Sequence, residues 1–155
     1  MENYVHGSDL LLGIETAGTG STVVFTPLGF SKSCSVKYST ETKERMHKNQ
    51  SNSSKQWADK SVSKLSCSIS AEGFFASDGS TIENAYETLE EKWLAGEKVV
   101  LKWGERATSG VTNAKKGTFV ITSLELSGPA DDDATWSASF ENSGAITTVT
   151  NSSQL

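Results

Sequence analysis

The sequence predicts a mainly β protein, an antiparallel two-sheet β-sandwich or partly open barrel with one flanking α-helix. Two observations predict this class. The chain holds 24 Ser and 16 Thr among 155 residues, and Ser disfavours helices while Thr favours strands. Several segments also alternate apolar and polar residues, which is typical of half-buried strands. The length fits a single domain over residues 1–155.

Two short strands are expected near the N-terminus, over residues 9–14 and 22–25, with a Gly-rich turn between them and Pro27 after the second. The N-terminus lacks the basic start and the longer apolar core of a secretory signal. No apolar run reaches the length of a membrane span. We therefore expect a soluble protein, made inside the cell and without membrane contact.

Two long strands are expected next, over residues 31–45 and 61–71, as a hairpin or open arm. Apolar and polar residues alternate over 33–39 and 64–71, so each strand buries one face there. The apolar residues are Cys34, Val36, Tyr38, Leu65, Cys67, Ile69 and Ala71.

Residues 46–60 separate the long strands and predict a long flexible loop. They follow no period and are rich in Asn, Ser and Lys around Trp57. Long loops inside compact domains are usually functional. Residues 43–64 carry a net charge of +4, whereas the rest of the chain carries −9. A basic loop on an acidic body favours self-association or an anionic partner, with a solvated loop as the alternative.

One helix is expected over residues 81–94. Ser80 and Glu83 fit a capping box before it, and Gly96 fits the position just past its end. Its apolar residues recur at helical spacing and should face the core. They are Ile82, Ala85, Tyr86, Leu89 and Trp93.

The remaining chain predicts strands over 98–103 and 118–126, the second with a β-bulge near Thr122 because its apolar phase shifts there. Residues 104–117 predict a polar loop. A last full strand surrounds Trp136, whose neighbours Ser137, Ser139 and Glu141 should face outward, and residues 145–150 are expected to pair briefly. Trp103 and Trp136 are placed in the core.

The sequence offers no catalytic set, and we expect no cofactor, no metal and no enzyme activity. His6 and His47 have no partner at metal-ligand spacing. Cys34 and Cys67 fit small core residues better than nucleophiles. The run 131–133 lacks the glycine and glutamate of a calcium loop.

Two binding functions stay open from the residues alone. A carbohydrate-binding sandwich would present exposed aromatics on a sheet face. A binder of single-stranded nucleic acid would use the basic loop, but it would need aromatics interleaved with the cations, and only Trp57 qualifies.

Four segments follow one another along nearly the whole chain: GSDLLLGI (7–14), SCSVKYSTETKERMHK (33–48), KSVSKLSCSISAEGFF (60–75) and ATWSASFENSGAIT (134–147). In this order they resemble the major tail tube proteins of long-tailed phages. The resemblance rests on their ordered combination, because none of them is a chemical signature alone.

The resemblance implies a structural subunit that forms stacked hexameric rings. These rings would form a tube for DNA ejection in the tail of the virion, and the subunit would be made in the cytoplasm of the bacterial host. The resemblance also implies tape-measure, initiator and terminator proteins as partners, and DNA that passes without specific binding. A tube protein of a related secretion or injection system is the alternative. Ring closure would also cover strand edges that are an aggregation hazard in a monomer.

Two sets of residues follow for such a tube. The polar parity of the long strands is expected to face the lumen, where small hydroxyls give a weakly binding wall. This set is Ser33, Ser35, Lys37, Lys64, Ser66, Ser68 and Ser70. The loop is expected to contact the next ring and to become ordered on stacking, through Arg45, Lys48, Lys55, Trp57 and Lys60.

Overall fold

The computed structural model describes residues 4–17, 23–28, 31–45, 58–75, 85–106 and 111–149. These residues form a short 3-10 helix η1, eight strands and one α-helix. Their bounds are η1 (Gly7–Asp9), β1 (Leu10–Ala17), β2 (Val23–Pro27), β3 (Ser31–Arg45), β4 (Asp59–Phe74), α1 (Ala85–Leu94), β5 (Val99–Arg106), β6 (Val111–Ser127), β7 (Thr135–Asn142) and β8 (Thr147–Val149).

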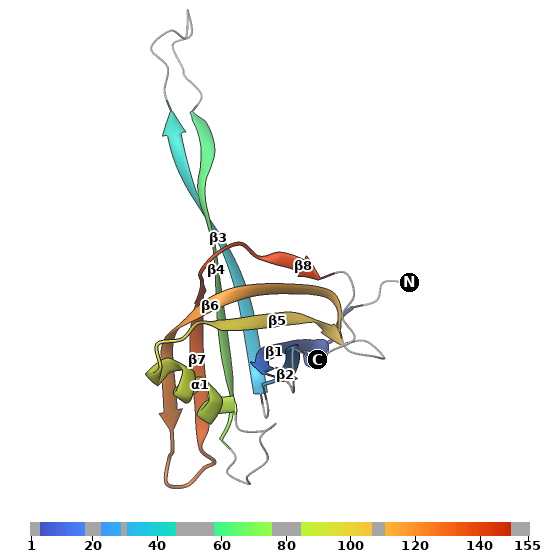
Figure 1. Ribbon diagram of the computed structural model, residues 1–155, viewed down its shortest axis with the longest axis vertical. Helices are drawn as coiled ribbons and strands as arrows, with labels where there is room; N and C mark the ends of the chain where they lie inside the picture. Colours follow the sequence, from blue (N-terminus) through green and yellow to red (C-terminus); the bar gives the residue numbers. More distant parts are fainter. Residues whose placement is uncertain are drawn as a thin grey trace, which may run out of the picture.

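The described strands form one antiparallel sheet that is bent on itself, so the mainly β class is confirmed and the two-sheet sandwich is not. The strand order is β2-β1-β5-β6-β7-β4-β3, and β8 also pairs with β6. In Figure 1, β5 and the first part of β6 run across the molecule, while β3, β4 and β7 run along its long axis.

The long strand β6 joins these two directions. Its first half pairs with β5 and its second half pairs with β7. The register shifts between Ile121 and Ser123, which confirms the predicted bulge near Thr122. A bulge bends its strand and increases the twist, so two crossed layers can share one hydrogen-bonded sheet.

A single core fills the bend. Its largest fully buried side chains come from both layers and from α1: Trp136, Phe119, Phe140, Ile69, Leu89, Leu101 and Val99. The predictions for Trp103 and Trp136 are confirmed. The prediction for Trp93 is wrong, because this side chain is 53% exposed. Leu89 is buried and Tyr86 is half-buried, whereas the last turn of α1 extends beyond the core.

Helix α1 ends as the sequence predicts. Gly96 has a φ of 69°, and its amide donates to the carbonyl of Trp93 at 3.1 Å. The amide of Glu97 donates to the carbonyl of Lys92 at 3.0 Å. These bonds satisfy carbonyls that the helix leaves free. The predicted capping box and first turn, residues 80–84, lie outside the described residues.

Two predicted loops are shorter than expected. Asp59 and Lys60 belong to β4, not to the loop 46–60, because they pair with Arg45 and Glu44 in β3. Opposite charges on directly facing positions stabilise an antiparallel pair. The predicted polar loop 104–117 is wrong as well, since β5 reaches Arg106 and β6 begins at Val111. Polar outer faces conceal these strand ends in the sequence.

The β3–β4 hairpin projects far beyond the rest of the described molecule (Figure 1). We call residues 38–45 and 59–66 of this hairpin the arm. Nearly every side chain of the arm is exposed. Among the described helices, none is long and apolar enough to cross a membrane.

Candidate assembly surfaces

The outer side of β3, β4, β7 and the second half of β6 forms a polar surface, which we call the serine face. The register aligns Ser35, Ser70, Ser139 and Ser123 in one row across these four strands. The hydroxyls of Ser35 and Ser70 are hydrogen bonded to each other at 2.7 Å. Side chains alternate across a sheet, so the core takes the apolar residues and the serines are left outside.

All seven residues predicted to line a lumen lie on the serine face. They are Ser33, Ser35, Lys37, Lys64, Ser66, Ser68 and Ser70, and each is exposed or half-buried. That this face is turned to a lumen stays a prediction. The sequence did not reveal that Ser123, Ser137 and Ser139 continue the face, because strand order is not encoded locally.

The charges of the serine face are nearly balanced. Glu41, Glu72, Glu125 and Glu141 lie on it with Lys37 and Lys64, and Lys32 lines a shallow pocket there with Glu72 and Glu125. The Lys64 ammonium lies 3.8 Å from the Glu41 carboxylate. The Ser33 hydroxyl donates to Glu72 at 3.0 Å. The lysines therefore do not make this face cationic.

The far end of the arm carries two of the five residues predicted to contact the next ring. Arg45 and Lys60 are exposed and face Asp59 and Glu44 across the hairpin. Lys48, Lys55 and Trp57 lie outside the described residues.

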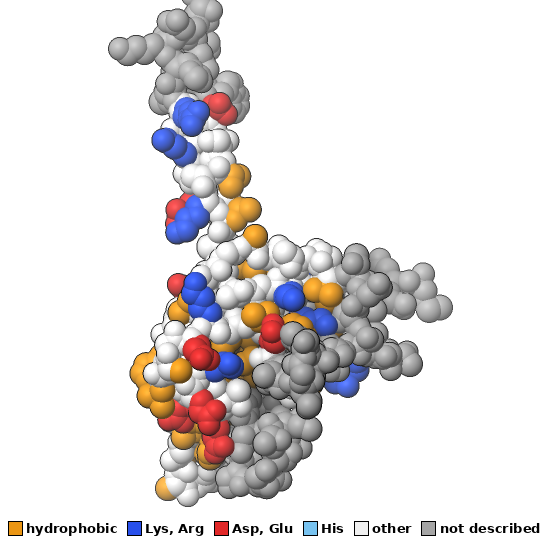
Figure 2. Space-filling view, viewed as in Figure 1, with side chains coloured by type: hydrophobic (Ala, Val, Ile, Leu, Met, Phe, Trp, Pro, Cys, Tyr) orange, Lys and Arg blue, Asp and Glu red, His pale blue; other side chains and the backbone are white. Residues whose placement is uncertain are grey.

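The side of the arm opposite the serine face carries exposed apolar side chains beside Thr40 and Thr42. Tyr38, Val62 and Leu65 lie there with exposures of 60%, 62% and 69%, and we call these three residues the apolar stripe. Figure 2 shows hydrophobic side chains along one side of the arm. Where the arm leaves the body, a groove of about 580 Å³ lies between Tyr38, Leu65 and Ile146. The period of two contained this signal for Tyr38 and Leu65, which have the parity of the core residues. The register shift between Glu41 and Thr42 brings Val62 to the same side.

The serine face has an open edge on each side. Within the described residues, β3 pairs only with β4, and β6 beyond Phe119 pairs only with β7. The Cys67 amide donates to the Asn142 side chain at 2.8 Å, away from its β3 partner Tyr38. Because paired positions alternate in an antiparallel ladder, Tyr38 and Val36 direct their backbone amides and carbonyls to the open edge. Such an edge can pair with another chain.

A lysine pair lies on the other half of the sheet. Lys102 is 4% exposed and directly faces Lys116 across β5 and β6. Their ammonium groups lie 4.8 Å and 5.6 Å from the centre of the Phe25 ring, within the range of cation–π attraction. Burial lowers the pKa of Lys102, and the charge of Lys116 lowers it further.

The other candidates from the sequence have structural surroundings. Cys67 is buried and Cys34 is half-buried, and burial raises the pKa of both thiols, so both are small core residues. The His6 ring accepts a bond from the Ser8 amide at the start of η1, and residues 131–133 form an exposed turn. In the described ranges, no His, Cys, Asp or Glu side chains gather in a group that could hold a metal. His47 lies outside these ranges.

Comparison with known proteins identifies the family. A family model described as phage tail tube protein matches residues 4–148. A search of curated proteins finds no match. Among solved structures, the chain is similar to one from the tail of an empty gene transfer agent particle with C6 symmetry. The TM-score is 0.72 at 21% identity, covering 94% of this chain and 99% of the other.

Two further structures share the fold. A chain of the virion of a native gene transfer agent matches with a TM-score of 0.69 and 18% identity, over 94% of this chain and 99% of that one. The tail tube of SPP1 matches with a TM-score of 0.65 and 12% identity, over 96% and 81%. With a family match across nearly all of its length, the chain belongs to the phage tail tube protein family.

Proposed function

We propose that this chain is a structural, non-catalytic subunit of a phage tail tube, located in the tail of the virion. Copies assemble into hexameric rings that stack into a conduit for DNA. The family match and the C6 symmetry of a structurally similar tail support this role. The observation that carries it is the serine face, a four-stranded sheet with two open edges and one polar side.

The open edges suggest how a ring closes. The serine face has four consecutive antiparallel strands, in the order β3, β4, β7 and the end of β6. The outermost strands, β3 and β6, therefore point in opposite directions. Rotation about an axis along the strands therefore places β3 of one copy antiparallel to β6 of the next. Six copies of four strands make a barrel of 24 strands, which removes both edges.

The serine face is turned inward in this arrangement, because the other side of the same sheet is the core. Ser33, Ser35, Ser66, Ser68 and Ser70, with Lys37 and Lys64, then line the lumen with the serines of β6 and β7. Hydroxyls and balanced charges hold phosphates weakly. DNA can therefore pass without being retained.

The arm then reaches the neighbouring ring. Arg45 and Lys60, with Lys48, Lys55 and Trp57 of the loop, remain our proposed ring-to-ring contacts. Tape-measure, initiator and terminator proteins follow as partners from the family resemblance.

The test of the lumen is a pair of charged substitutions. Ser70→Arg combined with Ser139→Arg adds twelve positive charges to each six-copy ring along the serine row. Purified tubes of this variant should retain labelled double-stranded DNA in a salt-dependent way, whereas wild-type tubes should not. Asp131→Arg combined with Asp132→Arg, in an exposed turn, adds at least as much positive charge and serves as the matched control.

Electron microscopy of the same samples tests the assembly itself. Six-fold rings stacked into tubes support the proposal. A strict monomer that binds a sugar, with quenching of Trp fluorescence, would instead support a monomeric β-sandwich binding module.

A further inference from the structure

The apolar stripe of the arm is a surface that the described molecule leaves uncovered. Tyr38, Val62 and Leu65 follow the core residues of the same two strands, but they lie where the arm has left the body. Burial of exposed aromatic and aliphatic side chains is favourable, because it removes apolar surface from water. A run of three such residues beside a groove is typical of a protein contact.

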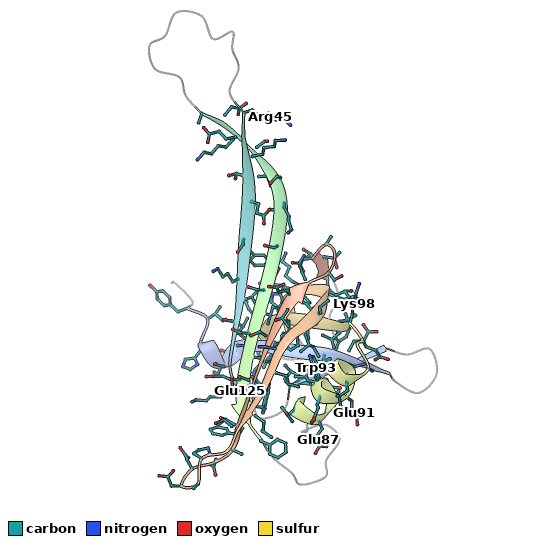
Figure 3. The ribbon with its side chains drawn as sticks, turned by 90° about the vertical axis from the view of Figure 1, so that its left-hand side faces the viewer. Arg45, Glu87, Glu91, Trp93, Lys98 and Glu125 are labelled. Carbon is teal, nitrogen blue, oxygen red and sulfur yellow. The ribbon has the colours of Figure 1, made fainter. Side chains whose placement is uncertain are left out.

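A second uncovered apolar surface lies at the end of α1. Trp93 and Leu94 are 53% and 71% exposed, although Trp93 has the spacing of a core residue. Figure 3 shows Trp93 on α1 with Glu87 and Glu91. Glu90 and Glu91 precede the pair in sequence, with Lys92 between, and both glutamates are exposed. We call Trp93 and Leu94 the helix pair.

The two surfaces have complementary charge. Residues 43–45 and 59–64, the outer part of the arm, carry four cations and two carboxylates, a net charge of +2. Residues 85–97 contain four glutamates and one lysine, so the surroundings of the helix pair are acidic. Opposite charges around matching apolar centres favour one orientation of contact and speed association.

The positions of the two surfaces exclude a contact within one copy. The arm rises from one end of the molecule, and α1 lies toward the other end (Figure 1). Copies stacked end to end along this axis bring the arm of one beside α1 of the next. A contact between two different surfaces of the same chain repeats without limit, as a tube requires.

We propose that the apolar stripe of one copy packs on the helix pair of a copy in the neighbouring ring, with the basic part of the arm beside the glutamates of α1. This inference rests on the proposed tube and adds to it the receiving surface for the arm. It also explains why Trp93 is left outside the core of the free chain.

Disulfide trapping tests the contact. A chain with Leu65→Cys and Leu94→Cys should give a ladder of covalent multimers when assembled protein is mildly oxidised and run on a denaturing gel. Leu65→Cys with Val120→Cys is the matched control, because Val120 is also exposed but lies beside Glu141 on the serine face, on the other side of the sheet from the core that α1 covers. Each single variant controls for bonds through Cys34 or Cys67.

The outcomes separate the contact from the tube. If electron micrographs show tubes but the test pair gives no stronger ladder of multimers than the control pair, the proposed contact is overturned and the proposed function is unaffected. A ladder of the expected pair without tubes would support the contact and contradict the tube.

Charge reversal gives an independent test. Lys43→Glu with Arg45→Glu should raise the protein concentration needed for assembly at least about tenfold, and so should Glu87→Lys with Glu91→Lys. The combined chain should recover assembly, because the opposite signs are restored. A combined chain that folds, by circular dichroism, but assembles no better than either parent would overturn the proposed pairing.

Discussion

At the scale of single residues, the lysine pair is the least expected feature of the fold. Two cations face each other across β5 and β6, and Lys102 is nearly inaccessible to solvent. Like charges at directly opposed positions destabilise a sheet. The Phe25 ring, close to both ammonium groups, offsets part of this cost through cation–π attraction.

The lysine pair predicts a pH dependence. Because the pKa of Lys102 is lowered in the folded state, the unfolded chain binds more protons between this pKa and the ordinary lysine value near 10.4. The contribution of Lys102 to the free energy of unfolding therefore increases as pH rises from its folded pKa to the ordinary lysine pKa. This gain is lost again as pH falls through the folded pKa. Relative to Lys102→Met, wild-type protein should gain free energy of unfolding from pH 7 to pH 10 in denaturant titrations.

The prediction would be contradicted if the free energy of unfolding changed with pH in the same way in wild-type protein and in Lys102→Met. Lys98→Met, which removes an exposed lysine, is the matched control and should follow the wild-type profile.

Residue positions could be predicted from the sequence where one period covers a whole element. Cys34, Cys67, Trp103 and Trp136 lie on their expected faces because a strand alternates regardless of what surrounds it. Trp93 could not be predicted, because a helical spacing says which face a residue shares but not where the covering sheet ends. The seven polar positions of the long strands were found by the same alternation.

At the scale of elements, the end of α1 depends on one backbone conformation. A Cβ at Gly96 would meet no atom within 4 Å, so the positive φ alone opposes a side chain there. Gly96→Ala should lower the free energy of unfolding by about 1 kcal/mol. Gly128→Ala is the matched control, since Gly128 is equally open and its φ is not positive.

Equal melting temperatures of the two glycine variants in thermal scans would contradict this account of the helix end. The same comparison checks whether α1 is held in the unassembled chain, where the helix pair is uncovered.

Element boundaries were harder to predict than element types. The bulge in β6 was visible because the apolar phase changes from Ile121 to Leu124. The strand ends within 104–117 were not visible in the sequence. Lys115 and Lys116 are typical of a loop, although the nearby Val111 and Ala114 are buried in the structure. The start of β4 depends on charge pairs with β3, which become apparent only when the register is known.

At the scale of the whole molecule, the open edge of β3 predicts a variant that separates folding from assembly. The Val36 amide points to this edge. Val36→Pro therefore removes a hydrogen bond that Val36 would donate to the neighbouring copy, and it removes no hydrogen bond to β4. The monomer should keep its circular dichroism spectrum, and tubes should be absent in electron micrographs.

Ser35→Pro is the matched control one position away, where the amide pairs with β4, and it should destabilise the monomer itself. Full-length tubes from Val36→Pro would contradict the proposed pairing of β3 with β6. The sequence could not predict this edge, because strand order joins segments that lie far apart in the chain. The sequence did predict the long strand over residues 31–45 that carries this edge.

The arm projects from only one end of the molecule, and this gives every stack of copies a direction. In the proposed tube, one terminal ring exposes arms without a partner ring, and the opposite terminal ring exposes α1 and its glutamates. The two ends differ in shape and in charge, so a single capping protein cannot fit both. Growth at the two ends can therefore proceed at different rates and be started and stopped by different partners.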